Sequence, residues 1–284
     1  MILIADGGST KCDWVLLDSS GNTQFKTTTK GLNPAVLPKA ELSKRIKENQ
    51  TLGQVFNEIK KVDFYGAGCG TPIPAALFKD VLSSIFTSAE VNIYEDTLAA
   101  VYATTNSPGI VCILGTGSNS CYFDGKNVSM PIASLGYIIM DEASGSYFGR
   151  QLIRDYYYKI MPADLSLQFS KTYNLDADEI KSNIFQKPHP NAYLASFTQF
   201  IFTSPKGVKE PYFHQLLKEG ISKFINYRIL SFENAHDLPI HFVGSVAHFS
   251  KEIIAECFLE KNLKLGNIIQ RPIDGLIEYY RRKI

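Results

Sequence analysis

The sequence predicts an α/β protein of two domains, each built on the element order βββαβαβα. Three observations lead to this fold class. The chain has 284 residues, which is enough for two domains of ordinary size. Two glycine-rich turns, at 6–10 and 115–119, each join two β-rich stretches. The elements expected after the first turn recur in the same order after the second, although the two halves share little literal sequence.

The first half is expected to open with three strands joined by short turns, which is the pattern of an antiparallel meander. Pro72 suits the first turn of a helix, and Asp96 suits a helix N-cap. We expect Trp14, on the second strand, to be a core residue. The expected strands are 1–5, 11–17, 23–29, 62–67 and 91–94. The expected helices are 39–49, 72–86 and 97–103.

The second half is expected to repeat this order with an enlarged helical part. Asp124-Gly125 is a typical hairpin turn, and apolar residues recur at helical spacing in 210–233. We expect strands at 109–114, 120–123, 127–132, 240–243 and 265–269. We expect helices at 144–161, 210–233, 247–259 and 274–282, with a helical insertion over about 163–205. The predicted domains are 1–107 plus 272–284, and 108–271.

Composition narrows the class of protein. A formal net charge of +1 argues against a nucleic-acid partner bound through bulk charge. The sequence has no apolar run long enough to span a membrane and no recognisable secretory signal. Its five cysteines form no C-x-x-C pair, which argues against a zinc site or a disulfide framework. We therefore expect a cytoplasmic protein with no membrane partner.

The first glycine-rich turn carries groups that suit phosphates. Gly7 and Gly8 allow a sharp turn and are expected to leave amides uncovered for an anion. Asp6 follows a buried strand, where a carboxylate can hold Mg²⁺, usually through water. Thr10 and Lys11 add a hydroxyl and a positive charge. The alternative is an ordinary tight hairpin, since this turn sequence is common.

The second glycine-rich turn strengthens the phosphate hypothesis. It occupies the equivalent position of the repeat, so the two turns are expected to meet where the halves face each other. Each would then offer amides to one polyphosphate in a central cleft. Two such turns at equivalent positions are more informative than either alone.

Five short motifs occur in the order found in a known family. They are DGGSTKCDW at 6–14, EDT at 95–97, LGTGSNS at 114–120, LGY…MDEASGS at 135–146 and FVGSVA at 242–247. Together they resemble the BadF/BadG/BcrA/BcrD ATPase family, and most closely its N-acetylglucosamine kinase branch. That family belongs to the sugar kinase/Hsp70/actin superfamily. The resemblance implies a two-domain actin-like (ribonuclease H-like) ATPase fold.

The resemblance implies an ATP site with Mg²⁺. The first phosphate loop would comprise Asp6, Gly7, Gly8, Ser9, Thr10 and Lys11, with hydrated Mg²⁺ at Asp6. The second phosphate loop would comprise Gly115, Thr116, Gly117 and Ser118. The adenosine motif of the family matches Gly244, Ser245 and Val246.

The resemblance also implies a site for an amino sugar. Its residues would be Asn33, Thr116, Asn119 and Asp141. The family's GDEGSG segment, which contains the aspartate, is MDEASG here. Met140 and Ala143 thus replace two glycines next to Asp141.

Asp96 is the expected catalytic base. Phosphoryl transfer needs positioning, charge neutralisation and acceptance of one hydroxyl proton, and a carboxylate can accept that proton. The alternative is a plain N-cap, a role compatible with catalysis. Glu95 is the less favoured base because it would point back along the strand end.

The sequence therefore predicts ATP-dependent phosphorylation of an amino sugar, most directly N-acetylglucosamine, with N-acetylmuramate and glucosamine as close variants. A second hypothesis is an ATPase that activates a radical dehydratase or reductase, as in another branch of the family. A third is a non-catalytic sensor of sugar or nucleotide. The expected partner is a small-molecule sugar, and a homodimer is one assembly left open.

Overall fold

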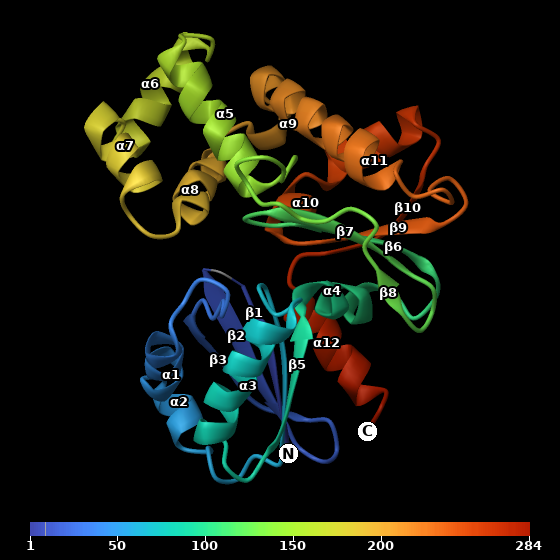
Figure 1. The fold of residues 1–284 in the computed structure, drawn as a ribbon. Helices are drawn as coiled ribbons and strands as arrows, with labels where there is room; N and C mark the ends of the chain where they lie inside the picture. Colours follow the sequence, from blue (N-terminus) through green and yellow to red (C-terminus); the bar gives the residue numbers. More distant parts are fainter. Residues whose placement is uncertain (9) are drawn as a thin grey trace. The chain divides into compact units, whose positions relative to one another are not determined.

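A computed structural model describes residues 1–8 and 10–284, and the chain divides into two compact units. Unit 1 comprises Met1–Thr104 and Arg271–Ile284, and unit 2 comprises Thr105–Gln270. Figure 1 shows both chain termini on unit 1. The last segment of the chain therefore folds with the first hundred residues.

Unit 1 is built on a five-stranded sheet in the order β3-β2-β1-β4-β5. Its strands are β1 (Ile2–Gly7), β2 (Lys11–Leu17), β3 (Thr23–Lys30), β4 (Lys61–Gly66) and β5 (Glu90–Glu95). The first three strands pair antiparallel, as the short turns between them predict, whereas β4 and β5 join in parallel. The ends of β1, β4 and β5 consequently lie along one edge of the sheet.

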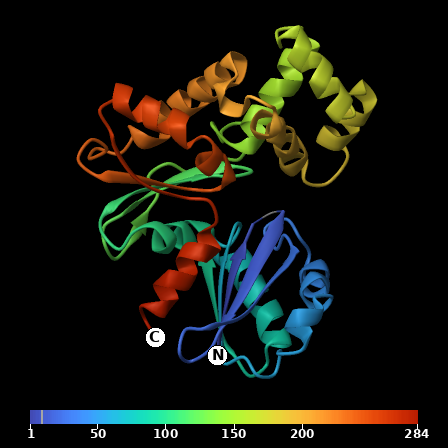
Figure 2. The ribbon, with the colours of Figure 1, turned by 180° about the vertical axis from the view of Figure 1, so that it is seen from behind.

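Helices cover both faces of the unit 1 sheet. One face packs against α1 (Lys39–Lys47), α2 (Gln50–Gly53) and α3 (Pro72–Ile85). The other packs against α4 (Asp96–Thr104) and α12 (Pro272–Arg281), which lie side by side in Figures 1 and 2. Alternate residues of β1 serve the two cores, because successive side chains of a strand point to opposite faces. Trp14 is fully buried in the first core, as expected.

A buried polar network joins α12 to the sheet. The Tyr280 hydroxyl donates to the carboxylate of Asp63 on β4 and lies 2.8 Å from the Tyr65 hydroxyl. Lys61 also pairs with Asp63 at 2.9 Å. Because an unpaired buried carboxylate is costly, this network favours docking of the C-terminal helix on unit 1.

Unit 2 repeats the strand topology of unit 1. Its strands are β6 (Gly109–Leu114), β7 (Ser118–Phe123), β8 (Val128–Ser129), β9 (Pro239–Val243) and β10 (Lys264–Ile269). Their order is β10-β9-β6-β7-β8, with β6, β7 and β8 antiparallel and β9 and β10 parallel. Read from the other edge, this is the order of unit 1. The predicted duplication is therefore confirmed, although β8 is shorter than the strand expected at 127–132.

The helices of unit 2 are more divided than the sequence pattern predicts. They are α5 (Gly145–Tyr157), α6 (Ala163–Thr172), α7 (Ala177–Phe185), α8 (Pro190–Thr203), η1 (Gly207–Lys209), α9 (Pro211–Phe224), η2 (Ile225–Ile229), α10 (Ser245–Phe249) and α11 (Lys251–Glu260). The helix expected over 210–233 ends as a π-helical turn, η2. The helix expected over 247–259 is two helices that meet at Ser250.

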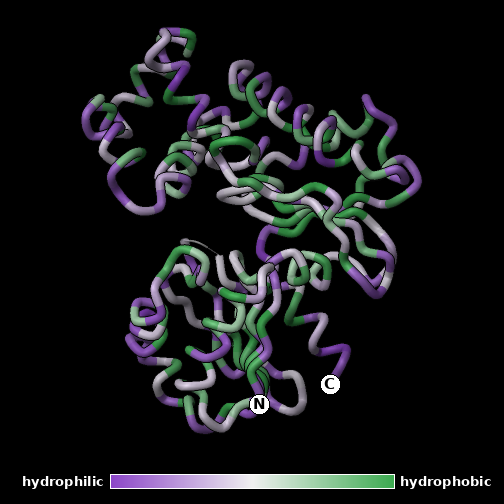
Figure 3. The backbone as a smooth tube through the Cα atoms, viewed as in Figure 1, coloured by the Kyte–Doolittle hydropathy of each residue, from purple (hydrophilic) through white to green (hydrophobic). Residues whose placement is uncertain are grey.

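The distribution of hydrophobic residues follows the arrangement of sheets and helices. In Figure 3 the hydrophobic segments run mainly along the strands, while hydrophilic segments lie on the outer helices. The core of unit 2 combines β6 and β9 with residues from most of its helices. None of the helices among the described residues has both the length and the apolar character needed to cross a lipid bilayer.

The contact between α5 and α8 depends on a glycine. A Cβ at Gly149 would lie 1.8 Å from the Leu194 carbonyl oxygen, so Gly149→Ala must push the helices apart. We expect this substitution to lower the free energy of unfolding by about 1–3 kcal/mol. Urea unfolding followed by circular dichroism measures the change.

Gly53→Ala is the matched control. Gly53 is also helical, and a Cβ there would meet nothing closer than Phe56 at 3.9 Å. Alanine is favoured over glycine in helices, so this control should leave stability equal or slightly higher. Equal stability of Gly149→Ala and the wild type would contradict the close helix packing.

Candidate functional site

The β1–β2 turn of unit 1 holds the first predicted phosphate loop. The Gly8 amide donates to the Lys11 carbonyl at 2.9 Å, which closes the turn. The carbonyls of Gly8 and Thr10 accept from Leu32 and Gly31, just beyond β3. The expectation that both glycine amides are uncovered is therefore wrong for Gly8. Ser9, also predicted in this loop, lies outside the described residues.

Two glycines bring the ends of β1 and β4 against one aromatic ring. A Cβ at Gly7 or at Gly66 would come within 2.2 Å of the Phe64 ring. Larger residues at either position would displace that buried ring. The space that a side chain would take at either glycine is thus filled by Phe64.

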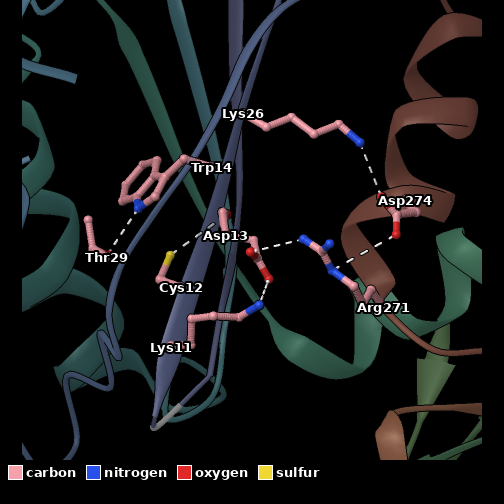
Figure 4. A network of polar contacts seen from close by, with 8 residues as sticks. All are labelled: Lys11, Cys12, Asp13, Trp14, Lys26, Thr29, Arg271 and Asp274. Atoms are coloured by element: carbon pink, nitrogen blue, oxygen red, sulfur yellow. Dashed lines mark hydrogen bonds and ion pairs between the residues drawn. The ribbon is translucent and has the colours of Figure 1, made fainter. Parts of the chain in front are cut away.

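Charged side chains cluster beside this loop. Asp6 and Asp13 are directly opposite in the β1–β2 register. Asp13 pairs with Lys11 at 2.9 Å and with Arg271 at 3.0 Å, as Figure 4 shows. Arg271 precedes α12, so the cluster joins the first loop to the C-terminal segment.

Asp6 is a carboxylate in an unfavourable environment for negative charge. Burial, with repulsion from Asp13 and Asp96, raises its pKa to about 7, although Lys11 and Arg271 act in the opposite direction. A group with this pKa is only partly ionised at neutral pH. A cation near Asp6 would favour its charged form.

Asp96 is the first residue of α4, at the end of β5. Burial and repulsion from Glu95 raise its pKa to about 6, while backbone amides at the start of the helix lower it. A carboxylate with this pKa is mostly ionised at neutral pH yet a better proton acceptor than an ordinary aspartate. The predicted N-cap setting and proton acceptance are compatible.

A second glycine-rich loop of unit 1, residues 66–70, touches two candidate side chains. A Cβ at Gly68, whose φ is +81°, would lie 2.1 Å from Asn33 Oδ1. A Cβ at Gly70 would lie 2.6 Å from Glu95 Oε1. The Asn33 Oδ1 also accepts from the Ala35 amide at 2.9 Å. Asn33 is thus held beside a loop that shares the sheet edge with Asp96.

The β6–β7 turn of unit 2 holds the second predicted phosphate loop. The carbonyls of Gly115 and Thr116 accept from the Gly145 and Ser146 amides at 2.8 and 3.0 Å. The loop therefore lies against the N-terminus of α5. A Cβ at Gly115 would meet nothing within 4 Å, so this backbone borders open space. The Gly115 amide donates to the Gly117 carbonyl at 3.0 Å, so the expectation of free amides in this loop is wrong for Gly115.

A pocket of about 410 Å³ opens beside this loop within unit 2. Its lining includes Gly115, Thr116 and Ser245, three residues predicted to bind nucleotide, together with Val246. The helix α8 contributes Ala195, Thr198, Gln199, Phe202 and Thr203. Phe249 completes an aromatic pair with Phe202, with ring centroids 5.3 Å apart. Pockets of this size and mixed lining accommodate small ligands.

Gly117 and Ser118 lie against the side chain of Asp141. A Cβ at Gly117 would lie 2.8 Å from Asp141 Oδ2, and the Ser118 amide bonds to the same carboxylate. Burial raises the pKa of Asp141, while Ser118 and Arg228 oppose that rise. The structure thus brings the predicted sugar residue Asp141 to the second loop. Asp141 and Ala143 both have positive φ, 70° and 57°.

Two parts of this arrangement were not predicted. The five pocket residues of α8 lie at i, i+3, i+4, i+7 and i+8, a one-face helical spacing that was visible in the insertion. Arg228 donates to Asn119 Oδ1, a predicted sugar residue. Nothing in the local sequence distinguishes this arginine from a surface cation.

The chain aligns with a putative N-acetylglucosamine kinase from Porphyromonas gingivalis at 36% identity and a TM-score of 0.92, covering 99% of each chain. A putative N-acetylglucosamine kinase from Chromobacterium violaceum aligns at 14% identity and a TM-score of 0.76, covering 98% of each. No protein-family model matches the chain, and neither does any curated protein.

A third solved structure extends the likeness of the fold. A ROK family glucokinase from Streptomyces griseus, in complex with glucose and AMPPNP, aligns at 13% identity and a TM-score of 0.57, covering 98% of this chain and 97% of that one. Together the solved structures confirm the predicted fold class, a two-domain α/β fold of the actin-like sugar kinases.

The raised pKa of Asp6 predicts how stability depends on pH. Because the folded pKa, about 7, exceeds the ordinary 3.8, the folded state holds the proton more tightly. Stability should therefore fall as pH rises from about 4 to about 7. Asp6→Asn removes the buried charge and should raise the free energy of unfolding by about 4 kcal/mol at pH 8 and by about 1 kcal/mol at pH 4.5. Urea unfolding without divalent cations measures both.

Asp18→Asn is a control that is expected to change the free energy of unfolding in the opposite direction. Amides of Asn22 and Ser20 lower the pKa of Asp18, so its charged form is favoured in the folded state. This substitution should lower stability at pH 8. A loss of stability at pH 8 in Asp6→Asn would contradict the electrostatic description of the cluster.

Proposed function

Because the chain belongs to the family of the putative N-acetylglucosamine kinase of Porphyromonas gingivalis, we propose that it is an ATP-dependent kinase of an amino sugar. N-acetylglucosamine is the substrate we favour, with N-acetylmuramate and glucosamine as variants to test. Membership of the BadF/BadG/BcrA/BcrD family remains a prediction from the sequence motifs. A homodimer and a cytoplasmic location also remain predictions.

The pocket beside the second glycine loop is the observation that carries this proposal. It combines Gly115 and Thr116 with Ser245 and Val246, from segments far apart in the sequence. We propose that the first pair lies beside the phosphates, and the second pair begins a helix. We propose that adenosine occupies this pocket, with the aromatic pair at Phe202 beside the base.

Unit 1 is proposed to contribute the second set of phosphate contacts. Gly7, Thr10 and Lys11 would bind ATP phosphates, and Asp6 would hold Mg²⁺ through water. The donor set fits that ion, because Mg²⁺ keeps several waters and takes one or two carboxylates. No group of three or more His, Cys, Asp or Glu side chains that could hold a metal occurs among the described residues. Bound to the phosphates, Mg²⁺ would supply neutralisation of negative charge.

Asp96 is proposed to accept the proton of the attacking sugar hydroxyl. Its carboxylate begins α4 and has a pKa raised to about 6, so it is ionised at neutral pH and remains basic. The sugar oxygen would attack the γ-phosphorus in line, the bond from that phosphorus to the β–γ bridging oxygen would break, and ADP would leave. Asn33, Thr116, Asn119 and Asp141 would position the sugar.

The alternative of an ATPase activator for a radical enzyme is not favoured. Such proteins hold an iron–sulfur cluster through exposed cysteines shared between subunits. Each cysteine of this chain is buried and lies in the described part. Burial raises the pKa of Cys12, Cys69 and Cys112, which disfavours the thiolate form that ligates iron.

A coupled assay of ADP release tests the proposed activity. The protein is incubated with Mg-ATP and a panel of N-acetylglucosamine, N-acetylmuramate, glucosamine and glucose. We expect sugar-dependent ADP release, greatest with an amino sugar. Release that no sugar stimulates would contradict the proposal, and ATP and sugar binding without turnover would favour a sensor.

Asp96→Asn tests the assigned base. Loss of the proton acceptor should lower kcat by about 10²–10⁴-fold while ATP binding, measured by calorimetry, stays within a few fold. Glu95→Gln is the matched control, since it removes the adjacent carboxylate and should keep most of the activity. Full activity in Asp96→Asn would remove this assignment.

A further inference from the structure

Arg228 is a buried cation on an unusual backbone. It lies in η2, the π-helical turn that ends α9, and is only 5% exposed. Such turns are rare and occur frequently at functional sites. The Arg228 carbonyl also accepts from the hydroxyls of Ser120 and Ser231, which hold this turn against β7.

The guanidinium contacts neutral acceptors. It donates to Asn119 Oδ1 and to the Ala133 carbonyl at 3.4 Å. Among described residues, no carboxylate lies within 4 Å of it. Asp141 and Glu142 act on its charge from farther away. Burying a cation without an ion-pair partner costs free energy. An apolar side chain at this position would avoid that cost.

The contact fixes the orientation of the Asn119 amide. Asn119 Oδ1 accepts from Arg228 and from the Ser120 amide at 2.9 Å, so both donors point at the oxygen. The amide nitrogen therefore faces the other way, toward Met130 Sδ at 3.7 Å. A thioether is a weak acceptor. Asn119 thus retains N–H groups to donate to a stronger acceptor.

We propose that Arg228 is a positioning residue that sets Asn119 as a hydrogen-bond donor to an oxygen of the sugar. The Ala133 contact ties the segment that leads to Asp141 to the same guanidinium. Of the predicted sugar residues, Arg228 therefore contacts Asn119 directly. This inference rests on the proposed function, because it concerns the sugar of that reaction.

Arg228→Met tests the inference. It removes the donors and keeps an unbranched apolar side chain. We expect the KM for N-acetylglucosamine to rise by about 10-fold or more, the effect of losing an oriented hydrogen bond, while the KM for ATP stays within about two-fold. A general loss of folding would instead lower the fraction of active enzyme and leave both KM values unchanged.

A double-mutant cycle with Asn119→Ala separates positioning from indirect damage. If Arg228 acts through Asn119, Arg228→Met should add little to the KM of the Asn119→Ala variant. Arg154→Met is the matched control, since Arg154 lies in the same unit and pairs with Asp155. This control should leave the KM for the sugar unchanged.

Arg228→Lys covers the case in which the methionine variant does not fold. Lysine keeps the charge but lacks the planar fork that reaches both acceptors, so an intermediate rise in KM for the sugar is expected. An active wild type with an unchanged sugar KM in both Arg228 variants, or additive effects in the cycle, would overturn this inference alone. A wild type that neither turns over nor binds N-acetylglucosamine in calorimetry would overturn the proposed function as well.

Discussion

After β9, the chain passes so close to the end of β6 that residue 244 has no room for a side chain. A Cβ at Gly244 would lie 2.2 Å from the Leu114 carbonyl oxygen, and its φ of +121° is rarely adopted by other residues. This approach sets α10 directly beside the loop that begins at Gly115. The pocket wall formed by Ser245 and Val246 follows from it. Without the glycine, the parallel strand ends of unit 2 could not border one pocket.

In unit 1 the ends of two parallel strands are likewise kept free of side chains, but by a different contact. There Phe64 lies under Gly7 and Gly66, which keeps the ends of β1 and β4 free of side chains. Around that edge, burial and the charges of Asp13 and Asp96 disfavour the ionised form of Asp6. A buried carboxylate of this kind lowers stability in its charged form, and such costs are typical of functional sites. The stability cost and the proposed chemistry thus share one cause.

Much of the fold could be predicted because its signals are local. Alternating strands, glycine turns and short connections specify a βββαβαβα unit, and the second unit repeats it despite little shared sequence. The adenosine motif and the second loop were predicted separately, and Ser245 and Gly115 line one pocket. The roles assigned to the site residues remain predictions.

The rest could not be predicted because it depends on packing between distant segments. The face of α8 that borders the pocket is defined only when Gly149 brings α5 against it. Arg228 is buried because a π-helical turn directs it at Asn119, more than a hundred residues earlier in the chain. The use of the Gly8 amide within its own turn is likewise a property of the folded loop.

A crystal structure with AMPPNP, Mg²⁺ and N-acetylglucosamine tests the central claim most directly. That claim is that the pocket beside Gly115 and Ser245 binds the nucleoside of ATP. The expected result is adenine beside Phe202, with phosphates at the backbone of Gly115 and Thr116. Nucleotide bound anywhere else on the chain, with this pocket still empty, would contradict it.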